Sequence, residues 1–146
     1  MVSDDNALKF HQQLKASVIR QPATVQEDDS MPTESSKIIE QLRGFHSAAR
    51  YYNRQSVYVH CLMGRNFNAL KEKYEGEGKD FIHDVQKELP NEYSRSHIYF
   101  LIALHKLAIE YNNIMYLSTP IRILKSKFSL IKQLIRQDEG FWKGPM

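Results

Sequence analysis

His60 and Cys61 stand side by side and combine the base and the thiol that a cysteine nucleophile needs. Neighbouring residues of a helix point about 100° apart, so this imidazole could not reach this thiol. Asp80 and His83 form a single acid-x-x-His pair, whereas a di-metal helical bundle uses two Glu-x-x-His units. The other histidines are scattered singly along the chain. We therefore expect no catalytic residue and no metal site.

The segment from Gly76 to Lys79 shares two glycines and a lysine with phosphate-binding loops. In those loops a strand comes first, a longer spacer separates the glycines, and a serine or threonine follows the lysine to bind magnesium. Here no strand signal precedes the segment, the spacer is too short, and Asp80 follows the lysine. The glycines predict the end of a helix instead. Since no dinucleotide fingerprint or serine triad is present either, we expect a chain that binds no cofactor and is not itself an enzyme.

Length and composition favour one compact, soluble domain. The chain has 146 residues, 42% of them hydrophobic, which is enough for a core, and no apolar run approaches the roughly 20 residues that span a membrane. Its first residues, MVSDDNALKF, are acidic where a secretory signal would be basic. The single cysteine, Cys61, rules out an intrachain disulfide framework. We expect a nuclear or cytoplasmic protein that is neither secreted nor bound to a membrane.

Charge and polar composition divide the chain into three parts. Residues 1–34 carry three basic and six acidic residues, while residues 35–146 carry seventeen and eleven. A short stretch of helical spacing from Ala7 to Ile19 precedes a run of proline, serine, threonine and acids, which cannot bury enough apolar surface to become ordered. We expect a short helix and an acidic flexible linker over 1–35, a helical domain over 36–137, and a tail over 138–146.

Apolar residues recur at helical spacing through the rest of the chain, and no segment alternates as a strand would. Helices are predicted from Ser36 to about Tyr74 with a break near Asn53 or Gly64, over Lys79–Leu89, from Ser94 to about Asn112, and from Pro120 to about Gln137. The run after Ser94 is apolar almost all round, which is typical of a central helix. The sequence therefore predicts an all-α protein, a compact bundle of about four to six helices.

Two of the predicted helices carry basic residues on one face. On the first, Arg43, Arg50 and Arg54 project to a common side, and no acidic residue lies between Gln41 and Lys71. On the last, the basic side holds Arg122, Lys125, Lys132 and Arg136. Such stripes could face the phosphates of a nucleic acid, because each neutralised phosphate releases counterions. The alternative is an ordinary solvated helix face.

The stretch ELPNEYSRSHIYF has the spacing of a helix-turn-helix, because Pro90 ends one predicted helix and Ser94 can cap the next. In that arrangement the start of the second helix enters the major groove, so Arg95 and Ser96 would approach bases or phosphates. Residues 72–92 hold seven acidic and three basic residues, which would repel a phosphate backbone. The alternative is a plain corner in a helical bundle.

Three short segments carry a resemblance to a known family: LMGRNFNALK (Leu62–Lys71), GKDFIHDV (Gly78–Val85) and YSRSHIYF (Tyr93–Phe100). Their order resembles that of phage and plasmid DNA-binding proteins, in which a glycine-bearing helix leads through a glycine turn into a short helix and then into a helix that begins with serine. The match spans about half of the chain. It implies a helix-turn-helix-like fold and double-stranded DNA as the partner. With the basic stripes, we expect DNA contacts from Arg95, Ser96, Arg122, Lys125, Lys132, Arg136, Arg43, Arg50 and Arg54.

More loosely, the helical body and its acidic, flexible front resemble the small accessory subunit of the ciliate DNA adenine methyltransferase complex. That resemblance implies a nuclear protein without catalytic residues, which works beside a catalytic methyltransferase subunit, helps to assemble the complex and holds DNA. The competing hypothesis is a protein-interaction adaptor with no DNA contact. Its surface would combine the acidic front with exposed aromatic residues, namely Tyr51, Tyr58, Phe141 and Trp142.

Overall fold

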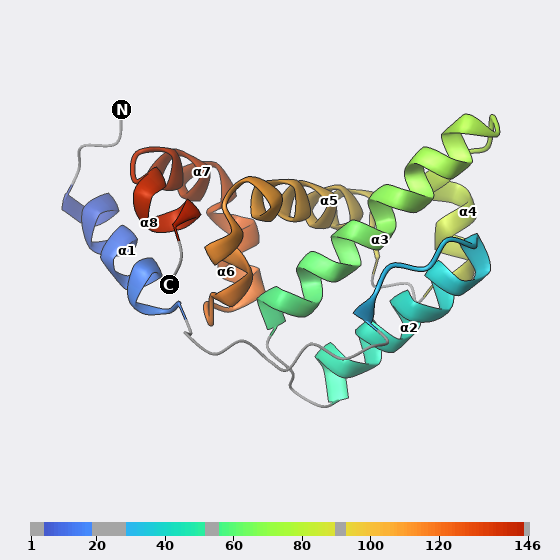
Figure 1. The fold of residues 1–146 in the computed structure, drawn as a ribbon, viewed down its shortest axis with the longest axis horizontal. Coiled ribbons are helices and arrows are strands. Elements are labelled where there is room, and N and C mark those ends of the chain that lie inside the picture. The colour runs from blue at the N-terminus through green and yellow to red at the C-terminus, as the bar shows by residue number, and fades with distance from the viewer. Residues whose placement is uncertain (1–4, 19–28, 52–55, 90–92, 145–146) are drawn as a thin grey trace.

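The computed structural model describes residues 5–18, 29–51, 56–89 and 93–144, and over these ranges the chain is helical apart from turns and short connections (Figure 1). The elements are α1 (Asp5–Ala16), α2 (Ser35–Tyr51), α3 (Ser56–Gly76), α4 (Phe81–Glu88), α5 (Arg95–Glu110), the 3-10 helix η2 (Asn112–Tyr116), α6 (Ile121–Ser126), α7 (Phe128–Arg136) and α8 (Glu139–Lys143). The described residues contain no strand, only an isolated bridge between Val18 and Leu117. The predicted all-α bundle is therefore confirmed.

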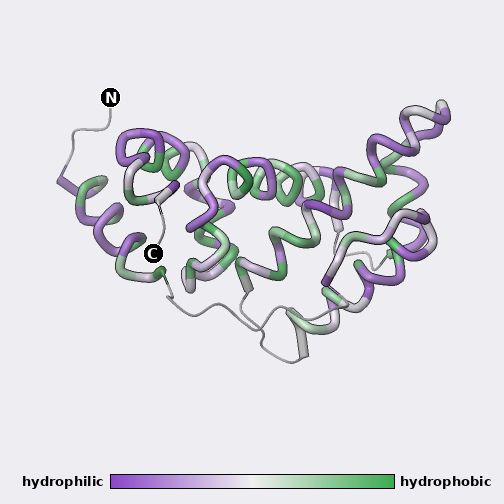
Figure 2. Tube along the Cα trace, viewed as in Figure 1, coloured by the Kyte–Doolittle hydropathy of each residue, from purple (hydrophilic) through white to green (hydrophobic). Residues whose placement is uncertain are grey.

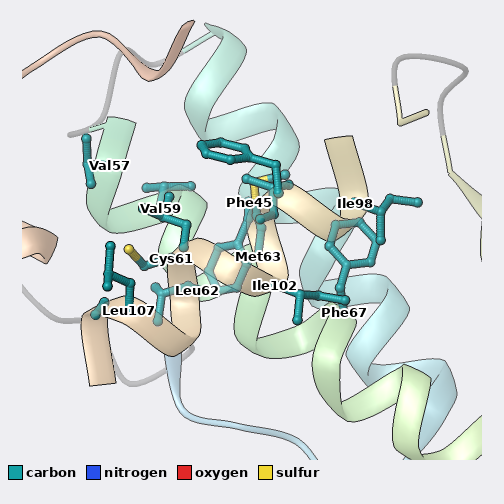
Figure 3. Packing of buried hydrophobic residues seen from close by; sticks show 14 of the residues in the cluster. Phe45, Val57, Val59, Cys61, Leu62, Met63, Phe67, Ile98, Ile102 and Leu107 are labelled. Atoms are coloured by element: carbon teal, nitrogen blue, oxygen red, sulfur yellow. The ribbon is translucent and has the colours of Figure 1, made fainter. Parts of the chain in front are cut away.

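The centre of the fold is the crossing of α3 and α5, which pack together more extensively than the other described pairs of helices. Figure 3 shows Met63 of α3 packed near Ile98 and Ile102 of α5. Gly64 lies at the crossing, where a methyl group in place of its hydrogen would overlap the carbonyl oxygen of Leu101. A glycine is therefore needed at this position for the backbones of α3 and α5 to approach so closely. Apolar residues are concentrated along α5, whereas the end of α3 that projects past α4 is hydrophilic (Figure 2).

One end of the crossing is covered by α2 and α4 (Figure 1). The carboxylate of Asp80 accepts a hydrogen bond from the backbone N–H of His83 at 3.2 Å and begins α4. The hydroxyl of Ser94 accepts one from the backbone N–H of His97 at 3.2 Å and begins α5, as the sequence predicts. Pro90, which was expected to end the preceding helix, lies outside the described residues. The corner between α4 and α5 therefore has a capped helix on each side.

The opposite end is built from the first and last helices, where α1 lies beside α7 and α8 (Figure 1). Trp142 is completely buried, and its indole N–H donates to Nε2 of His11 at 3.2 Å. The ammonium of Lys15 lies 2.8 Å from a carboxylate oxygen of Asp138. The buried side-chain amide of Asn113 donates to the carbonyl oxygen of Phe141, in α8, at 2.7 Å and to that of Gly144, just after α8, at 2.9 Å. These polar contacts join α1 and α8 to the bundle.

The helix expected over residues 120–137 is divided at Lys127, whose backbone (φ −114°, ψ 22°) leaves helical geometry. The hydroxyl of Ser126 donates to the carbonyl oxygen of Ile123 at 3.2 Å, and such a side-chain bond to the preceding turn often bends a helix. Together with the formation of α8, this division gives eight α-helices in the described residues, above the four to six expected.

The aromatic surface expected of an adaptor does not form at two of its residues. Tyr58 is 5% exposed and Trp142 is 0% exposed, so both belong to the core, whereas Phe141 is exposed. The expectation fails at Trp142 because this residue of α8 packs against His11 of α1, and at Tyr58 because α3 is central. The side chain of Tyr51 lies outside those described. The division of the chain at residues 35 and 137 stays a prediction.

Candidate nucleic-acid interface

The first turn of α5 presents the two residues expected nearest to DNA. Arg95 and Ser96 are both exposed and directly follow the capping Ser94. The guanidinium of Arg95 lies 5.3 Å from the centre of the Tyr99 ring, one turn further along the helix. An aromatic ring attracts the cation without accepting a conventional hydrogen bond from it, so the N–H donors stay available to an acceptor. Arg95 is therefore held against the helix and remains accessible.

One side of α5 is exposed along most of its length, although the sequence indicated a helix buried almost all round. We call this side the outer face of α5, and it spans an arc of roughly 100° at 3.6 residues per turn. Its members are Arg95, Ser96, Tyr99, Ala103, Lys106 and Glu110. Sequence reasoning misses Lys106 because apolar neighbours dominate the run. Arg95, Tyr99, Ala103 and Lys106 follow one another at intervals of four, four and three residues. This helical spacing could have predicted that Lys106 shares a face with Arg95.

Lys125 of α6 reaches the first turn of α5. Its ammonium nitrogen lies 3.3 Å from Nδ1 of His97. A lysine ammonium can only donate, so the imidazole must accept this bond and must be neutral, with its proton on Nε2. Burial of the ring, together with the nearby Lys125 and His60, lowers the pKa of His97 to about 4. The fold thus brings a cation from α6 to the start of α5 without cancelling its charge.

Lys132 of α7 approaches α5 through two ring contacts. Its ammonium lies 5.0 Å from the centre of the Phe128 ring. That ring packs edge-on against Phe100 of α5, with 5.2 Å between the ring centres. The two other predicted residues of this basic stripe, Arg122 on α6 and Arg136 on α7, are exposed. Lys125 contacts the first half of α5 directly, and Lys132 lies over a ring that packs against it.

The acidic residues of segment 72–92, which argued against DNA contact, are mostly paired within their own region. The ion pairs are Glu75 with Lys71 at 2.9 Å, Glu77 with Lys79 at 2.9 Å, Asp84 with Lys87 at 3.9 Å, and Glu88 with Arg43 at 3.2 Å. The carboxylate of Asp80 caps α4. Because opposite charges a few ångströms apart largely cancel beyond the screening length of about 10 Å, these acids repel a phosphate backbone less than their number suggests.

The cations of α5, α6 and α7 lack such partners. We call them the α5–α7 cations, and they are Arg95, Lys106, Arg122, Lys125, Lys132 and Arg136. Within the part of the chain that the structure describes, no carboxylate forms an ion pair with any of them. None of the described carboxylates therefore neutralises their positive charge.

Of the first predicted basic stripe, the structure describes the side chain of Arg43, and this residue is engaged in the fold. Arg43 donates to the backbone carbonyl oxygen of Glu88 at 2.8 and 3.1 Å, in addition to the contact with its carboxylate, and so ties α2 to the end of α4. Arg65, which projects to the same stripe, is half-buried and donates to Gln41 at 3.1 Å. The side chains of Arg50 and Arg54 lie outside those described. The DNA contact expected of Arg43 stays a prediction, and its Nε and Nη2 groups already donate to Glu88.

The other residue types that could support chemistry have structural roles. Cys61 is 1% exposed among apolar side chains of α3 and α5 (Figure 3), and burial raises the pKa of its thiol to about 12. A thiol that stays protonated at neutral pH is a poor nucleophile. Among the described side chains, no three of His, Cys, Asp or Glu cluster as a metal site would require. Gly78 has a φ of 74°, the left-handed geometry of a helix stop, just after the end of α3.

A groove of about 470 Å³ opens between α2, the end of α3 and α4. Its charged lining consists of the cations Arg43, Lys79 and Lys87 and the carboxylates Asp84 and Glu88. Arg43 is paired with Glu88, and Lys87 with Asp84. The groove therefore has no strong field of one sign that would select a charged ligand, and we assign it none.

No helix in the described ranges has both the length and the apolar character needed to cross a bilayer. Comparison with protein-family models, with curated proteins and with solved structures finds no match for this chain. A function is therefore inferred from the side chains and their geometry.

Proposed function

We propose that this protein is a non-catalytic, helix-turn-helix-like protein that binds double-stranded DNA chiefly through the phosphate backbone. The observation that carries the proposal is the difference in pairing between two groups of charges. Acids of α3 and α4 are paired with neighbouring cations, whereas the α5–α7 cations have no described carboxylate partner. The α5–α7 cations therefore keep their attraction for phosphate, and each one that contacts a phosphate releases counterions.

The corner between α4 and α5 supports the same proposal. A short helix is followed after six residues by a serine-capped second helix, an order that resembles a helix-turn-helix, and the second helix begins with the exposed Arg95 and Ser96. Lys125 and Lys132 lie near the same half of α5 through their contacts with His97 and Phe128. A duplex that approaches the start of α5 would therefore meet cations from three helices.

Contact with the backbone is favoured over reading of bases. Beyond Arg95 and Ser96, the first half of the outer face of α5 offers the half-exposed Tyr99, and Ala103 is its next member. Sequence-specific binding requires several polar side chains that reach the base edges in the major groove. We therefore expect affinity for DNA with only a weak dependence on its sequence.

A place in a larger assembly is the second part of the proposal, and it rests on the resemblance described above. A DNA-holding chain without catalytic residues would serve as the accessory subunit of a nuclear DNA adenine methyltransferase complex. It would raise the local concentration of DNA at the catalytic methyltransferase subunit. Co-elution with such a subunit in gel filtration, and a lower KM for DNA, are the expected results. Separate elution would reject the accessory role and leave DNA binding to its own test.

DNA binding is tested by the fluorescence anisotropy of a labelled duplex of about two helical turns. The protein should bind at low salt, and the logarithm of its affinity should fall linearly with the logarithm of the salt concentration. A variant with alanine at Arg122, Lys125, Lys132 and Arg136 should lose at least about tenfold in affinity near 0.1 M salt. Its salt slope should fall by about 0.9 for each phosphate contact removed.

A matched control removes the same charge from the other end of the molecule, by alanine at Lys37, Lys73, Lys79 and Lys87. These lysines are exposed, and three of them are paired with nearby acids. The control should keep most of the affinity, because surface fields are screened within about 10 Å. Equal losses of DNA affinity in the two variants would indicate that DNA is attracted by the net charge of the protein and not by a particular surface. Absence of binding at low salt would reject the proposal and favour the adaptor hypothesis.

A further inference from the structure

We propose that His97 is a positioning residue, which holds the ammonium group of Lys125 at the start of α5, ready to meet a phosphate of DNA. The inference rests on the proposed DNA-binding function and adds to it a residue that acts through another side chain. It concerns how the interface is prepared before DNA arrives.

The contact joins side chains from two helices. Nζ of Lys125, on α6, lies 3.3 Å from Nδ1 of His97, in the first turn of α5. Lys125 is exposed and His97 is half-buried, so the bond runs from the interior of the fold to its surface. Among the described carboxylates, none forms an ion pair with Lys125. The imidazole is thus the group that orients this lysine.

The imidazole is itself held by its neighbours. Its ring centre lies 5.9 Å from that of Tyr93 and 6.2 Å from that of Phe100, with interplanar angles of 35° and 30°. Both of these rings are buried. A ring that packs against two buried aromatic side chains has little freedom to turn, so the direction in which Nδ1 accepts is set by the core.

The surroundings also keep the imidazole an acceptor. The charged or titratable groups that face it are Lys125 from α6, His60 from α3 and Tyr93, which precedes α5. Lys125 and His60 both oppose a positive charge on the ring. A protonated His97 would offer N–H donors on both nitrogens and would repel the ammonium group. The neutral form, with its proton on Nε2, is therefore the one that holds Lys125.

A lysine that is already held loses less side-chain freedom when it binds a phosphate. Removal of the acceptor should therefore weaken DNA binding although every positive charge is retained. Replacement of His97 by phenylalanine keeps a ring between Tyr93 and Phe100 but removes the acceptor. Replacement by glutamine keeps an acceptor and serves as the conservative variant.

The test measures DNA affinity for Lys125→Ala, His97→Phe, His97→Gln and the double variant Lys125→Ala/His97→Phe. We expect Lys125→Ala to weaken binding roughly five- to tenfold near 0.1 M salt and to lower the salt slope by about 0.9. His97→Phe should weaken binding roughly two- to fivefold with the slope of the wild type. His97→Gln should recover most of that loss, and His97→Phe should add nothing when Lys125 is already alanine.

A loss in His97→Phe that persists without Lys125 would overturn the positioning role, as would an affinity equal to that of the wild type. Either result would leave the DNA-binding function intact if the four-residue variant still binds poorly. Nitrogen NMR of the histidines in the DNA-free wild-type protein gives an independent readout, with a neutral His97 protonated on Nε2 expected near pH 7. A proton on Nδ1 would overturn the bond to Lys125 whatever the variants do.

Discussion

The α2–α4 end of the molecule and the α5–α7 side both contain many cations but use them differently. In the first region Arg43 donates to Glu88, and Lys87 pairs with Asp84. In the second, Lys125 contacts a neutral imidazole and Lys132 lies over an aromatic ring. Carboxylates cancel the charge of the cations they hold, whereas imidazole and phenyl rings orient a cation and leave its charge in place.

This difference shows what a helical projection of charge can and cannot predict. Both basic stripes look alike in the sequence, because each is a face of one sign on a predicted helix. Their roles separate only when the neighbouring helices supply partners. A basic stripe is a candidate phosphate-binding surface when no carboxylate pairs with its cations. Within the described residues this condition holds for the stripe on the last predicted helix.

The largest change in stability should come from a substitution at the crossing of α3 and α5, which holds the two regions in place. Gly64→Ala would drive a methyl group into the carbonyl oxygen of Leu101 and close to Cβ of His105. Because the first obstacle is backbone, α3 and α5 would have to move apart. We expect the free energy of unfolding to fall by about 3 kcal/mol or more, measured by urea denaturation followed by circular dichroism.

A matched glycine variant controls for the change in helix propensity. Gly44 lies on the exposed side of α2, and a methyl group there would have no atom within 4 Å of it apart from the neighbouring residues and backbone of its own helix. Gly44→Ala should therefore stabilise the protein by about 0.5–1 kcal/mol, because alanine favours the helix. Similar stability of the two variants would contradict the close crossing of α3 and α5.

A smaller effect should appear on the α5–α7 side when the pH falls. The pKa of His97 is about 4 in the folded protein, below its ordinary value of 6.5. Well above pH 6.5 the ring is neutral in both states. Between pH 6.5 and 4 the unfolded chain takes up a proton that the folded protein does not, so the stability that depends on a neutral His97 is progressively lost. We expect a loss of about 1 kcal/mol, since water screens the half-exposed ring.

His97→Phe isolates this contribution from those of other titrating groups. The difference in free energy of unfolding between the wild type and this variant should be constant well above pH 6.5 and should change as the pH falls through 6.5 towards 4. Urea denaturation at a series of pH values measures it. Two curves that run parallel throughout would mean that burial does not lower the pKa of His97, and would weaken the case for its bond to Lys125.

Features that depend on nearby residues could be predicted from the sequence. Ser94 caps the second helix of the corner, and Gly78 takes the left-handed geometry that follows the end of α3. The exposure of Arg95 and Ser96 follows from their place directly after the cap. In each case the physical cause lies within a few residues of the feature, so local pattern was sufficient.

Features that depend on distant residues could not be predicted. Trp142 is buried, and its indole N–H donates to His11, which is 131 residues earlier in the chain. Arg43 is engaged by Glu88, 45 residues away, and Lys125 contacts a histidine 28 residues before it. Periodicity shows which side of a helix is basic but not which helix will lie against it, and this is why the two basic stripes could not be told apart.

The smallest expected effects separate the two regions most directly, because they come from one arginine in each. Arg43→Ala removes bonds to the carbonyl oxygen and carboxylate of Glu88 and should cost about 0.5–1 kcal/mol of stability, with little change in DNA affinity. Arg136→Ala should change stability by less than about 0.5 kcal/mol, but should lower DNA affinity several-fold and the salt slope by about 0.9. Urea denaturation and anisotropy on the same two variants measure both quantities. If Arg43→Ala weakened DNA binding as much as Arg136→Ala, pairing with an acid would not decide which cations meet DNA, and the contrast between the two regions would lose its functional meaning.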